Sequence, residues 1–234
     1  MVNEAGSSPH VLDVSRGLAV VRTRIERAGG DPQAVTVLAV TKGFGPGALV
    51  AARAAGLSQV GENYAAELLA KRGADETAGF APLRWHFLGA IQTNKIRSLA
   101  AAVDCWQSVS RPVEAERIAA AAPGATVLLQ VALSADPDRR GCRPEGIPSL
   151  CSSARELGLE VIGLMAVAPF GASEARSGFA RVRGLADDLG LPVRSMGMSD
   201  DLELAVAEGS TMVRVGRALF GERPASSAPA RFGR

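Results

Sequence analysis

Short apolar runs rich in β-branched residues alternate along the chain with longer stretches rich in Ala, Leu and Arg. The short runs predict buried strands, and the longer stretches, which have helical periodicity, predict helices. The predicted strands are 35–41, 58–61, 85–88, 103–107, 126–132, 160–165, 193–196 and 211–215.

The predicted helices lie between these strands, with one more before the first strand. Many of them end at a glycine, which is typical of a helix C-terminus. The helices are expected at about 11–28, 46–55, 63–72, 93–101, 111–121, 144–157, 172–189 and 199–207, and the glycines are Gly56, Gly73, Gly158, Gly190 and Gly209.

Strands joined by helices pair in parallel, and eight such units favour a closed barrel over an open sheet. We therefore expect an α/β fold, a single (β/α)8 barrel with an N-terminal helix, over residues 1–222. One such barrel takes about 250 residues, which fits this chain. Residues 223–234, rich in Pro, Ala and Ser, are predicted to form a flexible tail.

Composition excludes several classes of protein. A net charge of +2 without a basic run argues against a nucleic-acid partner. The sequence shows neither a signal-peptide pattern nor an apolar stretch long enough to span a membrane. The three cysteines lack C-x-x-C spacing, which argues against a disulfide framework or zinc site and favours the cytoplasm. With no second domain predicted, we expect a monomer.

Lysine is rare here, with only Lys42, Lys71 and Lys95 beside 23 arginines. A desolvated lysine forms imines and arginine does not, so Schiff-base chemistry would fall on one of these three. Lys42 follows the apolar strand 35–41, where barrels place their active sites, and burial there lowers the pKa of an amine. An ordinary salt bridge is the alternative. Lys71 is predicted at the end of a polar helix, and Lys95 on the surface or rim.

Two loops late in the chain suggest a phosphate site, because barrels often bind phosphate after their last two strands. Ser199 is predicted at a helix start, where its hydroxyl and backbone N–H are available to a ligand. Gly216 would allow close approach of a phosphate, and the N–H of Arg217 could donate to it. The alternative is that Ser199 or Asp200 simply caps a helix. Asp200 and Asp201 would oppose an anion, so they are expected to point away from it.

Arg214 shares one strand face with Met212 because side chains alternate along a strand. If that face is the barrel interior, the guanidinium needs an acceptor. The ring nitrogen of pyridoxal 5'-phosphate (PLP) is one candidate, and a carboxylate such as Asp200 or Glu62 is the other. Asn63, in the loop after the second strand, is either a cofactor ligand or a simple helix start. His86 is interpreted as a core residue rather than a catalyst.

Residues 43–48 fit the pattern G-x-G-x-x-A after a strand, and Glu62 lies near the distance of a ribose-binding acid. This favours a dinucleotide site as an alternative. Against it, Pro46 lacks an N–H, Lys42 crowds the first glycine, and the chain has too many strand–helix units. A cofactor-free Schiff-base aldolase would need only Lys42 and a phosphate site, and it also remains open.

Read together, several segments resemble the pyridoxal phosphate homeostasis protein family, which is similar to the N-terminal domain of alanine racemase. The resemblance covers roughly residues 11–222. The segments are Leu38–Lys42, Gly61–Tyr64, Trp85–Gly89, Gln92–Lys95, Gly163–Met165, Ser195–Asp201, Glu208–Gly216 and Phe220–Gly221.

The resemblance implies a barrel with PLP held as a Schiff base on Lys42. It implies phosphate contacts at Ser199, Gly216 and Arg217, and Arg214 facing the pyridine nitrogen, with Asn63 as a further cofactor-binding residue. The chain departs from the family at three places. A Gly-Phe-Gly sequence follows Lys42, residue 217 is arginine where threonine is common, and segment 134–141 lacks the usual Lys-Xaa-Gly and is assigned no role.

Two functions compete within this resemblance. One is a non-catalytic PLP carrier that supplies PLP-requiring apo-enzymes, and the other is an amino-acid racemase. Racemisation needs a base on each face of the substrate, and alanine racemases take the second from another domain. The only tyrosine here is Tyr64, on a different loop, and Arg214 would make PLP a poor electron sink. The carrier is therefore the favoured function.

Overall fold

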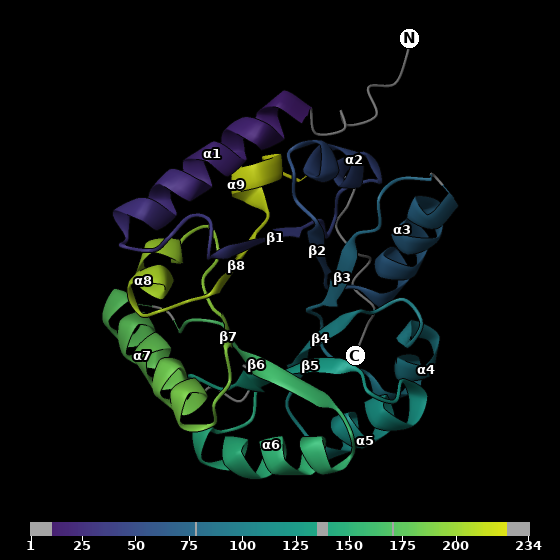
Figure 1. Cartoon of the computed structure of the whole chain (residues 1–234), viewed down its shortest axis with the longest axis vertical. Coiled ribbons are helices and arrows are strands. Elements are labelled where there is room, and N and C mark those ends of the chain that lie inside the picture. Colours follow the sequence, from purple (N-terminus) through teal and green to yellow (C-terminus); the bar gives the residue numbers. More distant parts are fainter. Residues whose placement is uncertain (1–10, 78, 135–139, 170, 224–234) are drawn as a thin grey trace.

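The computed structural model describes residues 11–77, 79–134, 140–169 and 171–223. Eight parallel strands close into a barrel in chain order, with β1 paired to both β2 and β8 (Figure 1). The predicted fold class is thereby confirmed. The strands are β1 (Thr36–Val40), β2 (Gln59–Glu62), β3 (Arg84–Phe87), β4 (Cys105–Val109), β5 (Thr126–Val131), β6 (Glu160–Ala166), β7 (Val193–Ser195) and β8 (Met212–Val215).

Helices surround the barrel, and α1 lies against α8 and α9 beside the last strand (Figure 1). In the part of the chain that the structure describes, none of them is both long and apolar enough to cross a membrane. They are α1 (Val11–Arg27), α2 (Gly47–Ala54), α3 (Ala65–Thr77), α4 (Ile96–Leu99), α5 (Pro112–Ala121), α6 (Ile147–Glu156), α7 (Ala172–Asp188), α8 (Leu202–Ala207) and α9 (Arg217–Phe220), with 3-10 turns η1 (Thr93–Lys95) and η2 (Pro144–Gly146).

Three helix predictions need correction. α3 continues past Gly73 to Thr77, so this glycine does not end it. α8 begins at Leu202, three residues later than predicted, because residues 199–201 form a turn. The short helix α9 was not predicted. The other four glycines do end helices, each with a positive φ that favours glycine.

The strands have two distinct apolar faces. Trp85 and Phe87 pack outward in a large core that also contains helix residues such as Phe179. A small cluster of strand residues only, Cys105, Leu128 and Met165, lies apart from it, and since a barrel has two faces this cluster must lie inside. Side chains that alternate with the outer core therefore point into the barrel.

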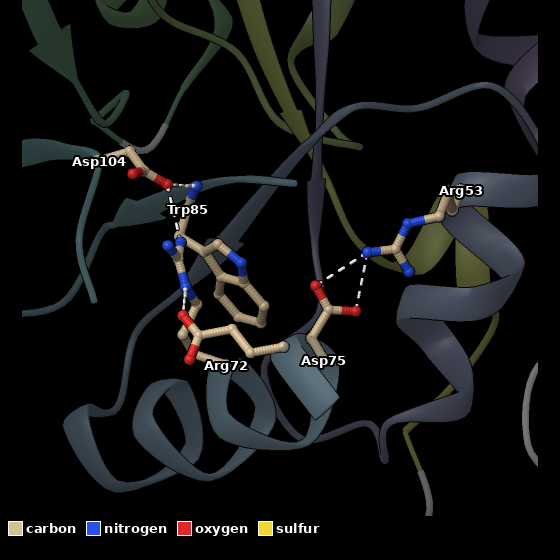
Figure 2. Close-up of polar contacts among 6 residues, drawn as sticks. Arg53, Arg72, Asp75, Trp85 and Asp104 are labelled. Carbon is tan, nitrogen blue, oxygen red and sulfur yellow. Dashed lines mark hydrogen bonds and ion pairs between the residues drawn. The ribbon is translucent and has the colours of Figure 1, made fainter. Parts of the chain in front are cut away.

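Polar side chains join α2, α3 and the start of β3 on the outside of the barrel (Figure 2). Arg53 Nη2 donates to both carboxylate oxygens of Asp75 at 2.8 Å, and its guanidinium lies 5.0 Å from the ring centre of Phe80. Nearby, one oxygen of Asp104 accepts from Arg72 at 3.0 Å and from the backbone N–H of Trp85 at 2.7 Å. These contacts connect α2 to α3, and they connect α3 and the start of β3 to Asp104, just before β4.

Asp75→Asn is expected to lower the free energy of unfolding by roughly 2 kcal/mol, because it leaves the mostly buried Arg53 without its counter-charge. Urea unfolding measures this change. Glu76→Gln is the matched control, since Glu76 is 62% exposed in its pair with Arg72 and such pairs contribute about 0.5 kcal/mol or less. Equal effects of the two variants would contradict the prediction.

Candidate functional site

Lys42 lies two residues beyond the end of β1, on the wall of a cavity of about 330 Å³. Its side chain is half-buried, and burial lowers the pKa of its amine, with Arg223 and Arg214 acting in the same direction. The expectation of a desolvated amine at this strand end is confirmed. A lowered pKa leaves more of the amine unprotonated at neutral pH and therefore nucleophilic.

The other two lysines have different surroundings. Lys71 was predicted at the end of a polar helix, but α3 continues to Thr77. Its Nζ is buried and donates to Glu62 Oε1 at 2.5 Å and to the Thr41 carbonyl at 2.7 Å. Lys95 is exposed in η1, as expected. Of the three lysines, Lys42 is the one whose amine reaches the cavity.

The backbone on both sides of Lys42 is held by charged groups under the loop. Lys71 binds the Thr41 carbonyl, and the Gly43 N–H donates to Glu67 Oε2 at 2.8 Å. Thr41 Oγ1 donates to Glu62 Oε1 at 2.7 Å, and burial raises the pKa of Glu62. This network limits the positions from which Lys42 can extend into the cavity.

The loop after β7 forms one side of the cavity. Ser199 lies in the turn before α8 rather than at the helix start, and neither it nor Asp200 caps that helix. Asp201 Oδ1 instead accepts the Met198 N–H at 2.5 Å and closes the turn. From α1, Arg24 Nη2 donates to the Ser199 carbonyl at 2.9 Å, so the first helix fixes this loop.

The loop after β8 forms the neighbouring side. Gly216 precedes α9, and a Cβ there would lie 3.2 Å from the Val40 carbonyl, which is tight packing against β1. Arg217 is exposed and binds Asp200 at 2.5 Å. Asp200 lines the cavity with a side chain that is 81% exposed and bound to Arg217, and its pointing away from an anion stays a prediction.

Arg214 is buried at the cavity floor and points into the barrel, because its strand neighbours Val213 and Val215 belong to the outer core. Its Nη1 donates to Ser195 and its Nη2 to the Ala166 carbonyl at 2.8 Å. Neither Asp200 nor Glu62 pairs with it in the described part of the chain. Burial lowers the pKa of Arg214 to about 10, so it stays a cation at neutral pH.

Asn63 also lines the cavity, two residues before α3 begins, so it is not the helix start. A Cβ on Gly89 would lie 1.9 Å from the Asn63 carbonyl, and only glycine there allows the loops after β2 and β3 to meet. Tyr64, the next residue, is 41% exposed and does not line the cavity.

The structure thus brings all six predicted residues, Lys42, Asn63, Ser199, Arg214, Gly216 and Arg217, to one cavity. It adds residues that sequence reasoning missed, above all Arg223, which had been assigned to the tail. The rest of the predicted tail and residues 135–139 of segment 134–141 lie outside the described residues. The other missed lining residues are Val40, Phe44, Leu88, Met165, Val167 and Met198.

The structure argues against a dinucleotide site at residues 43–48. Such fingerprints belong to open sheets with two halves, whereas this sheet is closed and its strands follow one another in order. Glu62, the expected ribose-binding acid, is fully buried and bound to Lys71 and Thr41.

Chemically, the cavity combines a nucleophilic amine, two loops able to face an anion, and a buried cation that forms no ion pair with another described residue. A phosphorylated aromatic aldehyde would use all three: the amine for the aldehyde, the loops of Ser199 and Gly216 for the phosphate, and Arg214 for an acceptor atom of the ring. The cavity volume lies in the range of sites for small ligands, about 300–1,000 Å³.

Residues 19–224 match the family described as "Alanine racemase, N-terminal domain". The pyridoxal phosphate homeostasis protein of Pseudomonas aeruginosa is 43% identical over 220 residues, which cover 90% of this chain and 94% of the relative. The protein of the same name in Escherichia coli K12 is 37% identical over 228 residues, which cover 90% and 97%.

Solved structures give the same result. PipY of Synechococcus elongatus PCC7942, with PLP bound, is 35% identical with a TM-score of 0.78, over 89% of this chain and 100% of PipY. Alanine racemase of Streptomyces coelicolor A3(2) is 20% identical with a TM-score of 0.73 over 60% of its length, and this likeness supports the fold alone. The chain belongs to the pyridoxal phosphate homeostasis protein family, and its residues 19–224 match the family described as "Alanine racemase, N-terminal domain".

Proposed function

We propose that this chain binds PLP as a Schiff base on Lys42 and serves as an intracellular carrier that delivers PLP to apo-enzymes. The observation that carries the proposal is a half-buried amine with a lowered pKa that shares one cavity with Ser199, Gly216 and Arg214. The PLP-bound structure of PipY, at 35% identity, supports the same ligand.

The residues have separate tasks in this proposal. Lys42 would hold the aldehyde group through its amine, with water released as the imine forms. The loops of Ser199, Gly216 and Arg217 bind the phosphate through hydroxyl and backbone N–H groups, and Asn63 borders the ligand from the loop after β2. Arg214 donates to the ring nitrogen and keeps it unprotonated, because a cation opposes a second positive charge beside it.

The same groups argue against turnover. Asp200 is the only carboxylate among the described residues that line the cavity, and Arg217 already binds it. No described histidine, cysteine or tyrosine lines the cavity, so a second base opposite Lys42 is missing. An unprotonated ring is also a poor electron sink. Both points favour a carrier, and the names of the curated relatives refer to homeostasis.

The test is to mix the purified protein with PLP, record the visible spectrum, reduce with borohydride and map the modified peptide by mass spectrometry. The expected result is a yellow protein with one modified lysine, Lys42. A colourless protein, or modification of Lys95 instead, would refute the site.

The carrier role has its own test. The PLP-loaded protein is incubated with single L-amino acids and assayed by chiral chromatography, and then with an apo-enzyme that requires PLP. We expect transfer to the apo-enzyme without sustained racemisation. Turnover at an ordinary enzymatic rate of about 1 s⁻¹ or more would contradict the carrier proposal. The monomer expected from the sequence can be checked on the same sample by light scattering.

Gly197→Ala is expected to weaken PLP binding at least tenfold, because its φ of +88° disfavours alanine and the new Cβ would lie 2.6 Å from that of Ala205. The loop that carries Ser199 would have to shift. The control is Gly158→Ala, with a φ of +79° and nothing within 4 Å of the added Cβ. A PLP titration should show ordinary affinity for the control; equal losses in both variants would contradict the prediction.

A further inference from the structure

The inside of the barrel contains a row of buried polar residues that the proposed site does not use. His86, Gln107 and Ser195 all alternate with residues of the outer core, so their side chains point inward. They lead from Gln59, near the start of β2, to Arg214 at the cavity floor. Barrel interiors are usually filled with bulky apolar residues, so this row calls for a physical reason.

The direction of each hydrogen bond follows from Arg214, which can only donate. Its Nη1 donates to Ser195 Oγ at 3.0 Å, and Ser195 then places its single hydroxyl proton on Gln107 Oε1 at 2.7 Å. Gln107 Nε2 therefore faces His86 Nδ1 at 2.7 Å and donates to it. The ring proton must sit on His86 Nε2, which donates to Gln59 Oε1 at 2.9 Å.

The reverse direction leaves groups unsatisfied. With the Gln107 amide flipped, Ser195 Oγ would accept from both Arg214 and Gln107, and its own proton would lose its acceptor. Gln107 Oε1 would also face Met212 Sδ at 3.2 Å, where the observed orientation places an N–H donor. Two acceptors in contact repel, and an unpaired buried hydroxyl costs free energy. The chain therefore has one favourable direction.

We propose that His86, Gln107 and Ser195 are positioning residues that hold the guanidinium of Arg214 in place for the ring nitrogen of PLP through a one-way hydrogen-bond chain. This rests on the proposed function, because it assumes that Arg214 faces the ring. Two backbone carbonyls already hold the guanidinium, and the chain fixes Ser195 Oγ as a third acceptor. When Gln107 no longer accepts its proton, the Ser195 hydroxyl can rotate, and its oxygen is no longer held as an acceptor for Arg214 Nη1.

A matched pair of variants tests the chain. His86→Gln keeps an acceptor for Gln107 and a donor for Gln59, whereas His86→Leu has neither. His86→Leu is expected to raise the dissociation constant of PLP about three- to tenfold and to move the visible band in the same direction as Arg214→Lys. His86→Gln should stay near the wild type. Inorganic phosphate, used as a separate probe, should bind all the variants equally.

Two further measurements keep the proposal testable if His86→Leu does not fold. Ser195→Ala should reproduce the shift, and nitrogen NMR of His86 in the ligand-free protein should show the proton on Nε2. A proton on Nδ1 would overturn the proposed hydrogen-bond chain. Equal shifts of the visible band in His86→Gln and His86→Leu would also overturn it. So would an unchanged, wild-type band in both Ser195→Ala and His86→Leu. A wild-type protein without any visible band would instead refute the proposed function, and the NMR result would still decide the direction of the chain.

Discussion

Lys42→Ala is expected to abolish the visible absorption band that forms with PLP and to weaken PLP binding on the order of a hundredfold. The reason is that the variant removes the amine that reaches the cavity, while Ser199, Gly216 and Arg214 remain to bind the phosphate and the ring. Lys71 cannot substitute, because its Nζ is buried against Glu62 and Thr41. A spectral titration with PLP measures both effects.

Lys95→Ala is the control for this experiment, since Lys95 is exposed in η1 and lies outside the lining of the cavity. It should keep the band and the affinity. Both variants should unfold in urea within about 0.5 kcal/mol of the wild type, because neither removes a packed apolar group. A visible band that survives in Lys42→Ala would refute the attachment of PLP to Lys42 and would indicate that another amine forms the Schiff base.

The fold could be predicted from the sequence because the barrel repeats one simple pattern. Most strands lie in short stretches rich in apolar residues, and most helices end at a glycine with positive φ, so local signals suffice for the fold. The pattern fails where polar residues face inward. β4 was expected at 103–107 but spans Cys105–Val109, since its buried Ser108 looks like a loop residue in the sequence.

The candidate site could be predicted only as far as strand ends and loops determine it. The position of Lys42 follows from the end of β1, and the loops of Ser199 and Gly216 follow from β7 and β8. The contacts of Lys71 with Glu62 and of Asp200 with Arg217 join different elements, and no local pattern encodes them. α9 has four residues, which is too short for a helical period to show.

The burial of His86 is expected to make the free energy of unfolding depend on pH. The ring is buried, and burial lowers its pKa from 6.5 to about 3, with Arg84 acting in the same direction. Between these values the unfolded chain binds the proton and the folded chain does not. Acid therefore favours unfolding: this group has almost no effect on the free energy of unfolding above pH 6.5, lowers it by about 3 kcal/mol at pH 4 and by about 4 kcal/mol at pH 3, and the full loss of about 5 kcal/mol is reached only below pH 3.

Other groups near His86 do not produce the same effect. Gln59 and Gln107, which bind the ring, carry no charge, and burial raises the pKa of the neighbouring Cys105 to about 12, so this thiol stays neutral. Glu62 contributes in the opposite sense, because its raised pKa makes the folded state bind a proton more readily. Its contribution is the same in the wild type and in a His86 variant, and it cancels when the two are compared.

The experiment compares wild type and His86→Gln in urea unfolding at several pH values between 3.5 and 7, with the range set by the two pKa values above. The wild type should lose stability relative to the variant as the pH falls, with a slope that approaches about 1.4 kcal/mol per pH unit. Ligand-free protein is used, so the result is independent of PLP. Parallel curves of the free energy of unfolding against pH for the two proteins would show that His86 is protonated in the folded barrel at an ordinary pKa. In that case, the hydrogen bond that its ring accepts from Gln107 could not persist in acid.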